Sequence, residues 1–69
     1  MDKVSKQIAE NLRVARTNAG LTQVQLADKA KINSNYYAKI ERAEIKPSVD
    51  TLEKIVKALG VKSSTIFPF

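Results

Sequence analysis

Cysteine and histidine are absent from this 69-residue sequence, and glycine and proline occur only twice each. The missing cysteines exclude disulfide bonds and thiolate nucleophiles, and the missing histidines remove the usual imidazole acid or base. A zinc site would lack its common sulfur and nitrogen ligands. The carboxylates are spaced as solvated helix charges, and no glycine-rich phosphate loop accompanies them. We therefore expect no metal, no cofactor and no enzymatic activity.

Long hydrophobic runs are also missing, since uninterrupted apolar stretches reach only a few residues. A membrane-spanning helix needs about 20 apolar residues. The start of the chain is polar and amphipathic, unlike a signal peptide. We expect a cytoplasmic protein that does not associate with a membrane. Its length allows one domain, 1–69, with a small helical core.

Positive charge exceeds negative charge, with 12 Lys and Arg against 7 Asp and Glu and a net charge of +5. Such a surplus attracts polyanions and speeds encounter with them. Many basic proteins bind no nucleic acid, so the charge is compatible with DNA binding without establishing it.

Apolar residues recur every three or four positions at both ends of the chain, which is typical of amphipathic helices. A helix is predicted over 4–19, closed by Gly20, with core-facing Val4, Ile8, Leu12, Ala15 and Ala19. Another is predicted over 49–59, capped by Ser48 and closed by Gly60, with core-facing Val49, Leu52, Ile55, Val56 and Leu59. A last short helix over 61–67 would have Ser63 as its cap and Pro68 as its stop.

Two short helices with a tight connection are predicted between these segments. Thr22 and Gln25 have the spacing of a capping box, so a helix begins at Gln23. Its inward residues are Leu26, Ala27 and Ala30. Asn33 is the next good N-cap and begins a helix over 34–42. Only residues 30–32 join the two, which is the helix-turn-helix arrangement, here over 23–42.

The helix over 34–42 has two chemically different faces. Tyr36, Tyr37 and Ile40 share one face, and we expect Tyr37 to be buried and Tyr36 partly buried, rather than to stack on single-stranded nucleic acid. The opposite face carries Asn35, Ala38, Lys39 and Arg42. Such polar faces are usually only solvated, but the preceding helix and short turn favour insertion into the major groove. There Asn can pair with adenine, Lys with guanine and a methyl group with thymine.

From Leu12 to Phe67 the sequence resembles the Xre/Cro/C1 helix-turn-helix family, which includes lambdoid phage repressors, Cro proteins and restriction-modification controller proteins. The likeness rests on LTQVQLADKA, on I-E-R at 40–42, and on KPSVDTLEKIVKALGV. The resemblance implies an all-α, five-helix, lambda-repressor-like domain whose second and third helices bind double-stranded DNA. It implies a transcription regulator.

The resemblance also assigns individual positions. Ser34, Asn35, Ala38 and Lys39 would face bases. Phosphate contacts are expected from Gln23, Asn33, Tyr36, Arg42 and Lys46. An ion pair between Arg16 and Glu41 would hold the recognition helix without touching bases.

The sequence departs from the family pattern at two turns. Lys31 and Ala43 stand where glycine is usual in the family. If the backbone keeps a positive φ there, each residue costs on the order of 1 kcal/mol. Otherwise the third helix could extend past Arg42, which would alter the place of Lys46.

The need to select one DNA site in a genome predicts a homodimer. One short helix contacts few base pairs, and each good contact discriminates by about 1–3 kcal/mol, so one copy cannot select one site in a genome. We expect a palindromic operator with half-sites about 10–10.5 base pairs apart. The segment 61–69 is expected to contribute to the dimer interface through Val61, Ile66, Phe67 and Phe69. For Ile66, a place in the monomer core is an equal alternative.

No small-molecule ligand is expected. The alternative function is an antitoxin or anti-repressor module that acts mainly through a protein partner, because fold alone does not determine function.

Overall fold

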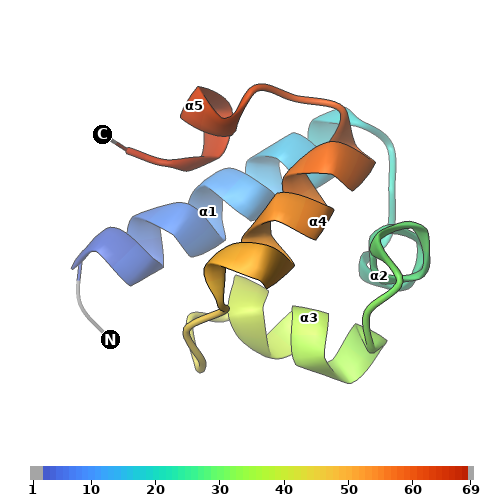
Figure 1. Cartoon of the computed structure of the whole chain (residues 1–69), viewed down its shortest axis with the longest axis horizontal. Coiled ribbons are helices and arrows are strands. Elements are labelled where there is room, and N and C mark those ends of the chain that lie inside the picture. Colours follow the sequence, from blue (N-terminus) through green and yellow to red (C-terminus); the bar gives the residue numbers. More distant parts are fainter. Residues whose placement is uncertain (1–2, 69) are drawn as a thin grey trace.

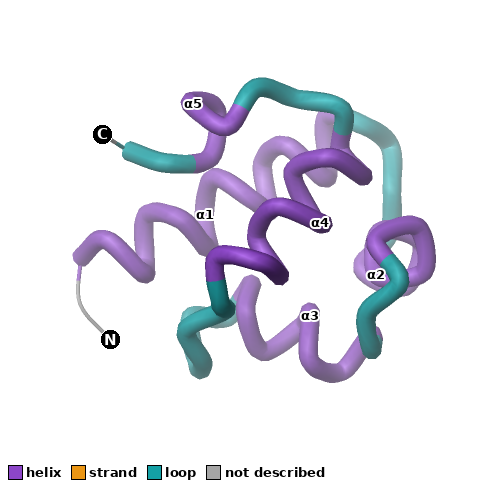
Figure 2. Tube along the Cα trace, viewed as in Figure 1, coloured by secondary structure: helices purple, strands orange, loops and turns teal. Residues whose placement is uncertain are grey.

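Five helices and no strand make up the part of the chain that the computed structural model describes, residues 3–68 (Figure 1, Figure 2). In chain order they are α1 (Lys3–Asn18), α2 (Gln23–Ala30), α3 (Ser34–Glu41), α4 (Val49–Leu59) and α5 (Ser63–Ile66). The predicted all-α, five-helix architecture is confirmed. None of the described helices has both the length and the apolar character needed to cross a bilayer.

The helices surround one shared core. α4 packs against α2, α3 packs against both α2 and α1, and α5 packs against α1. Figure 1 shows α5 and α3 at opposite sides of the molecule, with α1 and α4 between them. The largest fully buried side chains come from all five helices: Leu12, Leu26, Tyr37, Ile40, Ile55 and Ile66.

Side-chain caps begin the middle helices where the sequence predicts them. Thr22 Oγ1 accepts from the Gln25 backbone N–H at 3.0 Å, and Gln25 Oε1 accepts from the Thr22 N–H at 2.9 Å, which completes the capping box. Asn33 Oδ1 caps α3 by accepting from the Tyr36 N–H at 3.0 Å. The predicted cap of α5 is wrong. Lys62 is the N-cap, because it has the extended backbone conformation of a cap residue, and Ser63 is already the first residue of the helix.

The first three helices all end in a left-handed residue with the same pair of backbone hydrogen bonds. After α2, the Ile32 N–H donates to Ala27 O at 2.9 Å and the Lys31 N–H to Asp28 O at 3.1 Å. After α3, Glu44 and Ala43 make the equivalent bonds. This is the Schellman arrangement, which satisfies carbonyl groups at a helix end. Because Ala43 adopts φ +60°, α3 ends at Glu41 and does not extend past Arg42.

Three predicted core residues are exposed. Val4 borders an open hollow near the start of α1, and Ala19 follows the last turn of that helix, so neither is enclosed. Ala9 is buried instead. Val49, the first residue of α4, is 80% exposed, although Leu52 in the same turn is buried.

Glycine at the left-handed end of α2 should stabilise the fold. Lys31 has φ +60°, where a Cβ atom is strained. We expect Lys31→Gly to raise the free energy of unfolding by about 0.5–1 kcal/mol, measured by urea denaturation. Lys29→Gly is the matched control, because Lys29 lies inside α2 and should destabilise by about 1 kcal/mol. If Lys31→Gly lowered the free energy of unfolding as Lys29→Gly does, the backbone at Lys31 would not be strained.

Candidate nucleic-acid interface

The outward face of α3 presents short polar and long basic side chains to solvent. Asn35 and Lys39 are exposed, and Ser34 and Ala38 are half-buried beside them. The opposite face holds Tyr37 and Ile40 in the core, with Tyr36 half-buried at its edge. The predicted separation of the two faces is therefore confirmed. A single exposed ridge remains, narrow enough for a groove about 12 Å wide.

An ion pair attaches the last turn of α3 to α1. Arg16 Nε lies 2.8 Å from Glu41 Oε2 and Arg16 Nη2 lies 2.9 Å from Glu41 Oε1, so the guanidinium binds both carboxylate oxygens. The Glu41 side chain is only 4% exposed and that of Arg16 16%. Arg16 Nη1 also donates to Leu21 O at 2.8 Å, in the turn before α2. One guanidinium thus joins α1, the α1–α2 turn and α3.

Gln23 shares the same carboxylate. Its Nε2 donates to Glu41 Oε1 at 3.2 Å, which places the amide at the start of α2 beside the ion pair. Burial alone would raise the pKa of Glu41, but hydrogen bonds from Arg16 and Gln23 and the Arg16 charge lower that pKa below its usual value. The carboxylate is therefore charged at neutral pH, and it orients two donors.

The hydroxyl of Tyr37 lies in the same buried region. No hydrogen bond of ordinary geometry reaches it within residues 3–68. Burial raises the pKa of Tyr37 above that of an ordinary phenol, and Glu41 lies near enough for its carboxylate to raise that pKa in addition. Its ring is fully enclosed, so Tyr37 holds α3 to the core by packing.

Two other expected phosphate ligands, Arg42 and Asn33, already have intramolecular partners. Arg42 is exposed, and its Nε donates to Glu44 Oε2 at 2.6 Å. This hydrogen bond lowers the pKa of the Glu44 carboxyl. Asn33 uses its side-chain oxygen to cap α3, so its amide nitrogen is the group left to donate to a phosphate. Arg42 would have to exchange Glu44 for a phosphate.

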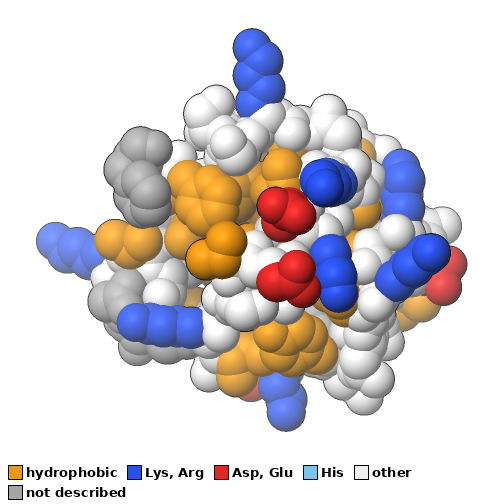
Figure 3. Space-filling view, viewed as in Figure 1, with side chains coloured by type: hydrophobic (Ala, Val, Ile, Leu, Met, Phe, Trp, Pro, Cys, Tyr) orange, Lys and Arg blue, Asp and Glu red, His pale blue; other side chains and the backbone are white. Residues whose placement is uncertain are grey.

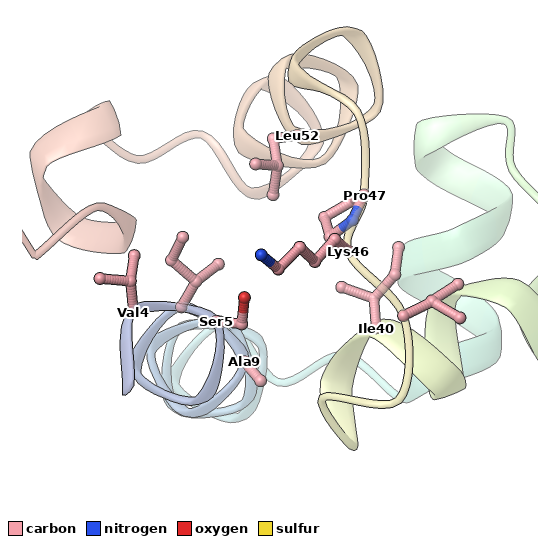
Figure 4. A pocket seen from close by; sticks show the side chains of 9 residues that line it. Val4, Ser5, Ala9, Ile40, Lys46, Pro47 and Leu52 are labelled. Atoms are coloured by element: carbon pink, nitrogen blue, oxygen red, sulfur yellow. The ribbon is translucent and has the colours of Figure 1, made fainter. Parts of the chain in front are cut away.

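Lys46 lies in the loop between α3 and α4 and is turned toward α1. Figure 4 shows its side chain pointing into a hollow of about 390 Å³, toward Ser5, rather than along the outward face of α3. The remaining lining is mostly apolar, from Val4, Ile8, Ala9, Ile40, Ile45, Pro47 and Leu52. The structure therefore does not bring Lys46 together with the other candidate DNA contacts.

The C-terminal segment forms part of the monomer core. Ile66 is fully buried in the monomer core, which is the alternative that the sequence left open for it. The reason is that α5 folds back on α1, where Asn11 Nδ2 donates to Ile66 O at 2.8 Å. Asn11 was not among the predicted functional residues, because no local pattern relates it to a carbonyl 55 positions away. Phe67 and Val61 are half-buried, and Phe69 lies outside the described residues.

Comparison with known proteins supports the interpretation of this geometry. A helix-turn-helix family model matches residues 12–66. The chain is 42% identical over 59 residues to the Immunity repressor protein of Bacillus phage phi105, covering 86% of this chain and 41% of that protein. It is 33% identical over 63 residues to Control protein C.BamHI of Bacillus amyloliquefaciens, covering 91% of this chain and 75% of that protein.

A solved structure shows the same fold. The restriction-modification controller protein C.AhdI from Aeromonas hydrophila superimposes with a TM-score of 0.88 at 27% identity, covering 91% of this chain and 96% of that one. Because the family model covers most of the sequence, this chain belongs to the helix-turn-helix family. The resemblance to the Xre/Cro/C1 type is confirmed. The chain spans only about two fifths of the phage repressor that it matches.

Removal of one partner from the buried ion pair should destabilise the protein. Arg16→Ala leaves Glu41 charged and enclosed, so we expect the free energy of unfolding to fall by about 2–3 kcal/mol, measured by urea denaturation at neutral pH. Arg13→Ala is the control, because Arg13 pairs with Glu10 one turn earlier on the exposed side of α1 and should change little. If the two substitutions lowered the free energy of unfolding equally, the assigned role of Arg16 would be wrong.

Proposed function

We propose that this chain is a homodimeric transcription regulator that binds a palindromic site in double-stranded DNA. The observation that carries this proposal is the outward face of α3, anchored from below by Tyr37 and Ile40 and at its end by Arg16. Because α3 is already held in this way, its contact with base edges costs little conformational entropy. The assignment is supported by the family membership and by relatives named as a repressor and a controller protein.

Base recognition is assigned to Ser34, Asn35, Ala38 and Lys39. Asn35 can donate to and accept from one adenine, Lys39 can donate to guanine, and the Ala38 methyl can contact thymine. Phosphates are assigned to Gln23, Asn33, Tyr36 and Arg42. Gln23 is the best placed of these, because Glu41 already orients its amide and the positive end of α2 attracts an anion.

The second copy of the chain is assigned to bind an apolar surface formed by Val49, Val56 and Phe67. These residues border a hollow of about 240 Å³, with Glu53, Lys57 and Ser63 at its edges. Figure 3 shows apolar side chains gathered over α5 and the start of α4. In a two-fold interface the same surface is buried on both subunits. Such a contact would remove Val49 from water, where it is now 80% exposed.

Loss of a base contact should relax sequence preference. We expect Asn35→Ala and Lys39→Ala each to weaken binding to the preferred sequence by about 1–3 kcal/mol, with a smaller effect on mixed-sequence DNA. The preferred sequence is first obtained by selection from a random duplex pool, and affinities are then compared by mobility shift at fixed salt.

The matched control is Lys62→Ala, which removes the same charge at the start of α5, across the molecule from α3 (Figure 1). It should leave the preference unchanged. Equal losses on preferred and mixed sequences for Asn35→Ala would contradict base recognition by α3. A selected sequence without two-fold symmetry would contradict the dimer.

A charge on the apolar surface should weaken the dimer. In a two-fold contact Val49→Asp introduces one negative charge from each subunit at the same interface. We therefore expect the sedimentation coefficient of the variant at micromolar concentration to fall toward that of a monomer. Val24→Asp is the control, because Val24 is 64% exposed but lies on α2, away from this surface. A dimer that survives Val49→Asp and dissociates with Val24→Asp would place the interface elsewhere.

A further inference from the structure

A second basic surface lies between the end of α2 and the second half of α4. It is a hollow of about 460 Å³ lined by Lys29, Ala30, Lys31, Lys54, Lys57 and Ala58, which we call the lysine hollow. Ala30 and Ala58 are buried, and the four lysines are exposed. Figure 3 shows basic side chains over α4 and α2. The small alanines allow the two helices to approach closely, and the long lysines stand around them.

Charge around the lysine hollow is only partly compensated within the chain. Lys54 Nζ lies 3.5 Å from Asp50, and Lys57 Nζ lies 3.5 Å from Glu53. Both are solvent-exposed pairs one helical turn apart, and such pairs are weak and easily exchanged. For Lys29 and Lys31, no carboxylate lies within 4 Å anywhere in residues 3–68. An anionic partner would therefore find two unpaired and two loosely paired ammonium groups.

Lys31 occupies a backbone position that favours glycine. Its φ is +60°, in the left-handed region, and the Schellman bonds after α2 hold it there. A lysine placed at such a strained position is a reason to look for a use of its side chain. Its ammonium group is on the same hollow as the other three, rather than dispersed over the surface.

The lysine hollow is separate from the candidate DNA contacts of α2. Gln23 begins this eight-residue helix and Lys29 lies near its end, and a helix of that length is about 12 Å long. The carboxylate-bound amide of Gln23 and the lysine hollow therefore occupy opposite ends of α2. At the α3 side, Lys31 lies two residues before Asn33, so the lysine hollow borders the proposed phosphate contact there.

The lining indicates the chemistry of this partner. Its surface is mainly apolar, from alanine methyl groups and lysine methylene chains, and its charges stand at the rim. A nucleic-acid backbone satisfies the charges but has no apolar group for the lining. A carboxylate-rich peptide with an apolar side chain between its acidic residues satisfies both.

We propose that the lysine hollow is a docking site for an acidic segment of another protein, which brings one apolar side chain onto Ala30 and Ala58 and carboxylates onto the surrounding lysines. The occupant of this site is a protein segment, distinct from the DNA that α3 contacts.

The test uses the full chain and two short fluorescein-labelled peptides of equal charge. One consists of glutamates with interspersed leucines, and the other has serines in place of the leucines. Fluorescence anisotropy at moderate salt should show tighter binding of the leucine peptide. The double variant Lys31→Glu/Lys54→Glu changes two residues that line the lysine hollow and not the hollow around Val49, and it should lose on the order of tenfold in affinity for the leucine peptide. The matched control, Lys3→Glu/Lys6→Glu, changes two exposed lysines of α1 by the same charge and should lose much less.

Three further readouts decide the outcome. In the unaltered protein, the leucine peptide should shift the backbone amide resonances of residues 29–31 and 54–58. Equal binding of the two peptides, or equal losses in the two double variants, would overturn the proposal. A loss of mixed-sequence duplex binding in the hollow variant alone, with peptide binding unchanged, would reassign the surface to DNA. Peptide binding at the hollow by a chain that prefers no DNA sequence would overturn the proposed function but support this site.

Discussion

The bidentate contact between Arg16 and Glu41 is the interaction on which the arrangement of the helices depends. Taking two charges out of water is costly, and the cost is offset only when the geometry is good and the remaining donors and acceptors are used. Here both carboxylate oxygens accept from the guanidinium, a third guanidinium nitrogen donates to Leu21 O, and Gln23 donates to the same carboxylate. The start of α2 and the end of α3 are thereby held against α1, which determines the angle at which α3 faces outward.

The two ends of α3 are determined by backbone geometry that does not use glycine. Lys31 precedes the cap of α3 and Ala43 follows its last turn, and both have φ +60°. Each pays a steric penalty because a Cβ atom crowds the neighbouring carbonyl oxygen. The hydrogen bonds of the two Schellman motifs and the packing of Ile32 and Ile45 against the core hold these turns in place. α3 is consequently limited to the eight residues Ser34–Glu41.

Three surfaces of different chemistry surround this small core. The outward face of α3 is polar and basic, the surface around Val49 and Phe67 is apolar, and the lysine hollow combines an apolar lining with a charged rim. α4 contributes to the last two on different sides, because Val49 and Val56 point toward α5 whereas Lys54 and Ala58 point toward α2. Lys57 borders both surfaces, and neither surface uses Leu52 or Ile55, the two least exposed residues of α4.

Local features were determined by the sequence alone. The capping residues Thr22, Asn33 and Ser48 start helices through bonds to the amides three positions away, so no distant contact is needed to recognise them. The two faces of α3 follow from helical periodicity for the same reason. Pairing over long separations was decided by tertiary structure: the bond from Asn11 to Ile66 and the bond from Gln23 to Glu41 join residues that no spacing rule connects. Burial at helix ends also depended on the fold, since Val49 begins α4 and Ile66 ends α5 and both are apolar, yet Val49 is largely exposed and Ile66 is fully buried. Periodicity identifies the face of a helix, but whether that face is covered depends on where the neighbouring helices end.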